Sequence, residues 1–100
     1  MAEDQELSRV ADMLKALAHP VRLCIVRGLW QSGGCNVARM QQCLEAPQST
    51  ISQHLAKLRA AGIIEGERNG LEVIYCLKSR AVEHLLAGLF DKEKDYHDMS

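Results

Sequence analysis

The four cysteines are the side chains of this 100-residue chain best suited to chemistry, and they are Cys24, Cys35, Cys43 and Cys76. Their spacing matches neither a Cys-x-x-Cys redox pair nor the paired cysteines of a zinc finger. Cys35 lies just before the start of a predicted helix, and Arg39 follows one turn later. Because a helix N-terminus and a nearby cation both lower the pKa of a thiol, we expect Cys35 to be the most reactive cysteine, with Cys43 as its partner.

Thiols in this pattern suit two kinds of chemistry. A soft metalloid such as arsenite binds two or three thiolates, with Cys35 and Cys43 as candidate ligands, whereas an oxidant or polysulfide links two thiols. The sequence leaves both open, together with an inert role for Cys43. Cys24 is a third candidate for sensing, although its apolar neighbours predict a position in the core. Cys76 is expected to be half-exposed.

A second group of side chains could contact DNA. Most of its members lie in or beside the predicted helix 49–61, on or next to the side away from the apolar positions Ile51, Leu55 and Leu58, with His54 near the edge of the apolar stripe. Ser, Gln and Lys are types that bond to base edges and phosphates. The candidates are Gln48, Ser49, Thr50, Ser52, Gln53, His54, Lys57 and, in a later hairpin, Arg68. The alternatives are a merely solvated helix face, a packed and hydrogen-bonded His54, and an exposed turn arginine.

The spacing of apolar residues predicts the elements that must position these groups. Helices are expected over residues 4–18, 20–31, 36–44 with Asn36 as N-cap, 49–61 and 79–91. Two strands, 63–67 and 72–78, flank an Asn69-Gly70 turn. Two short helices followed by a hairpin predict a winged helix-turn-helix, mainly α with a small β-hairpin wing (α+β), whose second short helix enters the major groove of double-stranded DNA.

Length, composition and charge limit the classes of protein that the chain can form. One hundred residues predict a single domain, 1–100, and no apolar stretch is long enough to span a membrane, so we expect a cytoplasmic protein with reduced thiols. The net charge is −1, but residues 7–80 carry ten Lys and Arg against five Asp and Glu, between two acidic ends. This moderately basic middle is compatible with a surface that faces phosphates.

The first and last helices are candidates for a dimer interface. Both have an apolar stripe that a chain of this size can cover only in part. We therefore expect a homodimer through residues 4–18 and 79–91, which would also match DNA sites with two-fold symmetry.

Three motifs resemble the ArsR/SmtB family of dimeric bacterial repressors. They are Leu-Lys-Ala-Leu-Ala-His-Pro-Val-Arg at 14–22, Gln-Ser-Thr-Ile-Ser-Gln-His-Leu at 48–55 and Leu-Arg-Ala-Ala-Gly-Ile-Ile at 58–64. The similarity covers residues 7–90. It implies a winged-helix homodimer that occupies an inverted-repeat operator and leaves it when an inducer binds.

The inducer sites of that family do not transfer to this chain. Where its zinc sensors carry ligands on the last helix, this sequence has Ser79, Ala81, Lys92 and Asp95, of which only Asp95 is a usual zinc ligand. Where its arsenite and cadmium sensors have a Cys-x-Cys pair, it has Asn36 and Ala38. We therefore expect no zinc site, no certain cofactor, and at most a rearranged thiolate site that holds arsenite or another soft ion.

The main hypothesis is a DNA-binding repressor that a thiol-directed inducer releases. The alternatives are a winged-helix module that binds another protein, and a regulator of the same family without a cysteine-based inducer site. An enzyme is not expected, because the sequence has no Cys-His-Asp arrangement, phosphate loop or cofactor fingerprint.

Overall fold

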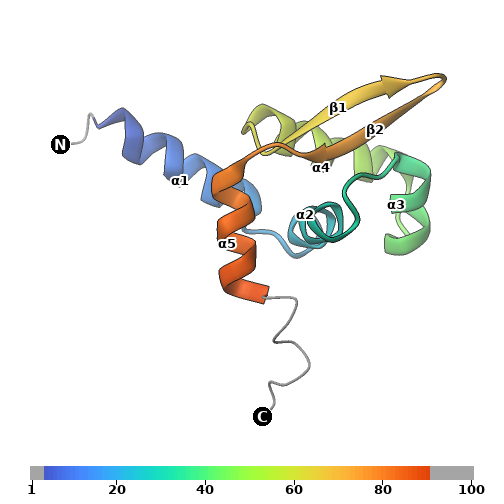
Figure 1. The fold of residues 1–100 in the computed structure, drawn as a ribbon. Coiled ribbons are helices and arrows are strands. Elements are labelled where there is room, and N and C mark those ends of the chain that lie inside the picture. The colour runs from blue at the N-terminus through green and yellow to red at the C-terminus, as the bar shows by residue number, and fades with distance from the viewer. Residues whose placement is uncertain (1–3, 91–100) are drawn as a thin grey trace, which may run out of the picture.

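A computed structural model describes residues 4–90 and contains five helices and one hairpin (Figure 1). In chain order they are α1 (Gln5–Leu17), α2 (Pro20–Ser32), α3 (Val37–Leu44), α4 (Gln48–Ala60), β1 (Ile64–Asn69), β2 (Glu72–Leu77) and α5 (Arg80–Phe90). Across the residues that the structure describes, every predicted bound lies within two residues of the observed one, and the predicted fold class is confirmed. Within the described residues, no helix has the length and apolar character needed to cross a membrane.

Side chains at the helix starts explain where three helices begin. The Asp4 carboxylate accepts hydrogen bonds from the first-turn amides of α1, and Asn36 caps α3 as predicted, accepting from the Arg39 amide at 2.9 Å. His19 caps α2, because its Nδ1 accepts from the Val21 amide at 3.1 Å, with Pro20 in the first helical position. The His19 cap was not predicted.

The core lies where α2, α4 and α5 meet beneath the base of the hairpin. Its central residues are the buried Ile25, Val26, Leu29, Ile51, Leu55, Leu58, Ile63, Val82 and Leu86. The predicted apolar face of α4 is thus confirmed. In α2, Ile25, Val26 and Leu29 are buried, whereas Cys24, which was predicted to lie in the core, is exposed on another face.

The hairpin turn differs from the predicted Asn69-Gly70. Asn69 is paired with Glu72, so the two loop residues are Gly70 and Leu71. Gly70 has φ of 71°, and Leu71 does not have a positive φ. A positive φ at the first loop position alone fits a type II′ turn, which favours glycine at that position. An Asn-Gly type I′ turn would need a positive φ at both loop positions.

Candidate nucleic-acid interface and thiol pocket

The outward face of α4 is polar and exposed. Ser49, Ser52, Gln53 and Lys57 are exposed opposite the buried apolar face, as is Gln48, whereas Thr50 is half-buried. Pro47 is the N-cap of the helix, and no side chain is bound to its first amides. Because free amides and the helix dipole favour anions at an N-terminus, this end can receive a phosphate.

His54 lies at the edge of that face and is held from two sides. Its Nδ1 is 3.4 Å from Nη1 of Arg22, and its ring centroid is 4.6 Å from that of His19. Burial lowers the pKa of His54, and the charges of His19, Arg22 and Lys57 lower it further. These contacts favour the packed, hydrogen-bonded interpretation over base reading.

Arg22 connects α4 to the rest of the domain, a role that was not predicted from the sequence. Its Nε donates to the carbonyl of Ala16 at 2.6 Å while its other end meets His54. One side chain of α2 thereby contacts both the end of α1 and the middle of α4. The residue stands in the motif at 14–22, but nothing in the spacing indicated this role.

Arg68 is exposed on β1, opposite Val73 and two residues before the loop. Its neighbours on the hairpin include three exposed acids, Glu65, Glu67 and Glu72. The hairpin is therefore an acidic ribbon with one arginine near its tip, and not the continuous basic arm that non-specific phosphate binding favours.

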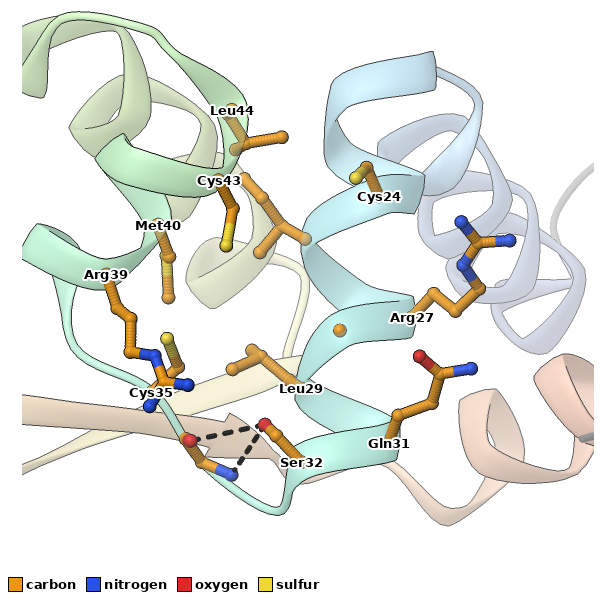
Figure 2. A pocket seen from close by; sticks show the side chains of 13 residues that line it. Cys24, Arg27, Leu29, Gln31, Ser32, Cys35, Arg39, Met40, Cys43 and Leu44 are labelled. Atoms are coloured by element: carbon orange, nitrogen blue, oxygen red, sulfur yellow. Dashed lines mark hydrogen bonds between the residues drawn. The ribbon is translucent and has the colours of Figure 1, made fainter.

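Three cysteines line one cavity of about 290 Å³ between α2 and α3 (Figure 2). Cys24 comes from α2, Cys35 from the loop before α3, and Cys43 from α3. In Figure 2 the sulfurs of Cys24 and Cys43 face the space between the two helices. The rest of the lining is largely apolar and includes Ile25, Leu29, Met40 and Leu44. The structure thus brings the three candidate sensing thiols to one place, and Cys76 on β2 lies outside it.

Cys35 does not have the acidic thiol expected from its sequence neighbours. Burial raises the pKa of Cys35, and the opposing effect of Arg39 is smaller. The burial has a long-range cause: the backbone of Cys35 is bridged to Tyr75 of β2 by two hydrogen bonds of 3.0 and 2.8 Å. Cys43 and Cys24 are exposed, so the prediction of a core Cys24 is wrong, while the half-exposure expected of Cys76 is confirmed.

Within residues 4–90, no three His, Cys, Asp or Glu side chains are close enough together to hold a metal ion. Ser79 uses its hydroxyl to cap α5, accepting from the Val82 amide at 3.1 Å. Asn36 caps α3 and donates to Oε1 of Glu72 at 2.7 Å. Lys92 and Asp95, and the last residue of the predicted helix 79–91, lie outside the described residues.

The pair α3–α4 followed by the β1–β2 hairpin defines a winged helix-turn-helix protein, the class in which the second helix of the pair is presented to DNA. A family model described as a helix-turn-helix domain matches residues 17–67.

Relatives of known role place the chain more closely. The transcriptional repressor PagR of Bacillus anthracis is 40% identical over 84 residues, 84% of each chain, and its crystal structure superposes with a TM-score of 0.78 over 85% of this chain and 97% of its own. The repressor SmtB of Mycobacterium tuberculosis is 42% identical over 80 residues. The matched region covers 80% of this chain and 58% of SmtB. The homodimeric winged helix-turn-helix domain of Mycobacterium bovis Mb0332 is 26% identical, with a TM-score of 0.82 over 98% and 90% of the two chains.

The chain belongs to the ArsR/SmtB family of winged helix-turn-helix repressors. It is a DNA-binding transcriptional regulator and not an enzyme.

Proposed function

We propose that the protein is a homodimeric repressor that binds an inverted-repeat operator through α4 and is released when a thiol-directed inducer acts in the α2–α3 pocket. One observation carries the proposal. Cys35 and Cys43 line a cavity whose wall is α3, and α3 packs directly against the recognition helix α4. A change at the thiols can therefore alter how α4 is held.

The operator contacts follow from the exposed face of α4. Gln53 lies in the centre of this face, and Lys57 lies at its edge. Ser49 lies in the first turn of α4, near the helix N-terminus that favours a phosphate. Gln53 is the candidate for reading a base edge, and Lys57 for a phosphate. Because its partner is chromosomal DNA, we place the protein in the cytoplasm.

Homodimerisation is supported by the apolar side chains that α1 and α5 leave uncovered. Leu7, Val10 and Leu14 of α1 and Leu89 of α5 are all exposed. Figure 1 shows these two helices at one end of the molecule and α3 with the hairpin tip at the other. A dimer through α1 and α5 would leave the DNA-facing elements free, and the similar Mb0332 domain is homodimeric.

The two inducer chemistries make different demands on the pocket. Arsenite would release water as it binds two thiols, whereas polysulfide would accept two electrons from them and leave as hydrosulfide. Cys35 and Cys43 are the pair for either reaction, because they are close enough for the charge of one to raise the pKa of the other. Cys24 stands on the opposite wall, which α2 forms.

Operator binding by cysteine variants tests the proposal. We expect arsenite or polysulfide to release wild-type protein from a duplex enriched by selection, measured by fluorescence anisotropy, and Cys35→Ser and Cys43→Ser to prevent that release. Cys76→Ser, outside the pocket, is the matched control and should respond like wild type. Loss of the arsenite response alone identifies coordination, and loss of the polysulfide response alone identifies oxidation. If wild type stays bound under both treatments, the thiol-directed inducer is refuted.

A further inference from the structure

We infer that the α2–α3 pocket is also a non-covalent binding site for a small aromatic monocarboxylate. The cavity of about 290 Å³ is at the lower end of the size of small-molecule sites, roughly 300 to 1,000 Å³. Its apolar walls come from two helices, with Leu29 of α2 and Met40 of α3 both buried. A slot with apolar walls on two sides fits one or two fused rings.

A cation at one end of the pocket supplies charge complementarity for a carboxylate. Arg39 lines the cavity, and Figure 2 shows its guanidinium at the same end as Cys35. Within residues 4–90 this guanidinium makes no hydrogen bond or ion pair, so its donors are available. Arginine pairs with carboxylates through two parallel hydrogen bonds.

The other arginine of the lining is occupied elsewhere. The guanidinium carbon of Arg27 lies 4.9 Å from the centre of the Phe90 ring, and in Figure 2 the side chain points away from Cys43 and Met40. The pocket thus presents a single available cation among its described lining, which favours one carboxylate over a dianion.

The remaining lining accommodates the ring. Cys43 and Cys24 face the end away from Arg39, and sulfur makes favourable contacts with aromatic edges. Gly28 of α2 leaves its wall open, because a Cβ built there would meet nothing within 4 Å. A bound ring would therefore lie across both exposed thiols and shield them from solvent.

A carboxylate bound in the pocket would also lie next to the β1–β2 hairpin, which is the wing of the fold. Cys35 is bridged to Tyr75 of β2, and Asn36 is hydrogen-bonded to Glu72, so the Arg39 end of the pocket is attached to the hairpin. This consequence for operator binding rests on the proposed function, but the binding itself does not. It can be measured without DNA.

Calorimetry with 1-naphthoate on the reduced protein tests the inference. We expect binding that the neutral 1-naphthamide does not reproduce, that Arg39→Gln weakens by about tenfold or more, and that Gly28→Leu blocks by filling the slot. Arg59→Gln, which removes an exposed arginine of α4 outside the pocket, is the matched control and should bind like wild type. Equal binding of the amide, unchanged binding by Arg39→Gln, or no heat at millimolar ligand would overturn the inference.

Thiol protection gives a second, independent measure. Naphthoate should slow the alkylation of Cys43 and Cys24 in wild type but leave that of Cys76 unchanged, as followed by peptide mass spectrometry. A triple variant with Cys24→Ser, Cys35→Ser and Cys43→Ser should lose any response to arsenite or polysulfide and still bind naphthoate. The wild type separates the two proposals: naphthoate binding without release from DNA by arsenite or polysulfide refutes only the inducer, and release without naphthoate binding refutes only the carboxylate site.

Discussion

Truncating one exposed leucine on α1 or on α5 should weaken the proposed dimer strongly. Leu7 is 66% exposed and Leu89 is 60% exposed in the single chain. Fully burying a leucine contributes about 1.5–3 kcal/mol, so covering the exposed part of either side chain contributes about 1–2 kcal/mol. A two-fold interface contains each residue twice, which makes about 2–4 kcal/mol per dimer, or a roughly 30- to 700-fold change in the dimer dissociation constant.

Sedimentation over a series of protein concentrations measures this effect. Leu7→Ala and Leu89→Ala should each shift the monomer–dimer midpoint to higher concentration by most of that factor. Leu71→Ala is the matched control, because Leu71 is 101% exposed but lies at the hairpin tip, away from α1 and α5. An unchanged midpoint in the first two variants, or an equal shift in Leu71→Ala, would refute the assignment of the interface.

Three further predictions concern single residues of the described chain. At neutral pH, iodoacetamide should modify Cys43 and Cys24 before Cys35, because burial raises the pKa of Cys35; peptide mass spectrometry that finds Cys35 modified first would contradict this. The pKa of His54 in the folded chain is below its ordinary 6.5. As pH falls below about 6.5, the imidazole of His54 therefore takes up a proton more readily in the unfolded chain than in the folded one. Urea unfolding should therefore show wild type losing more stability on acidification than His54→Gln, and equal losses would count against the shift. Finally, Gly70→Ala should destabilise by about 1 kcal/mol because of its φ of 71°, whereas helical Gly28→Ala should stabilise by up to about 1 kcal/mol; urea melts that reverse these signs would refute the backbone argument.

The order of elements and the register of α4 could be predicted because they depend on local patterns. Ile51, Leu55 and Leu58 recur at helical spacing, and a stripe of that kind must be buried somewhere. Asn36 before a short helix could be predicted as an N-cap, because its side chain accepts a hydrogen bond from an amide only two or three residues later. Both predictions were confirmed by burial and by the observed hydrogen bond.

The errors arose where distant parts of the chain decide the outcome. Cys24 stands in a helix with apolar residues on nearly every side, and the placement of β2, α4 and α1 against that helix determines which side is covered. The pKa of Cys35 was expected to fall because Arg39 is near in sequence, but β2 comes from 40 residues later and contributes the burial that raises it. The convergence of three cysteines from separate segments on one cavity has no local signal either.

The hairpin turn was missed for a different reason. An Asn-Gly pair usually marks the two loop residues of a type I′ turn. Here the strands pair one residue further along, so Asn69 is the last paired residue and Leu71 enters the loop. Register is set by how the side chains of both strands meet their neighbours, which a single dipeptide does not encode.

Selection of bound sequences from a random duplex library tests the central claim, that α4 of a dimer reads the bases of an inverted repeat. Purified reduced protein should enrich two half-sites related by a two-fold axis, with centres about one helical turn apart. Gln53→Ala should lose preference at one base pair in each half-site, at a cost of about 1–3 kcal/mol on the enriched duplex and little on random DNA. Enrichment of no symmetric sequence, or an unchanged preference in Gln53→Ala, would contradict the account.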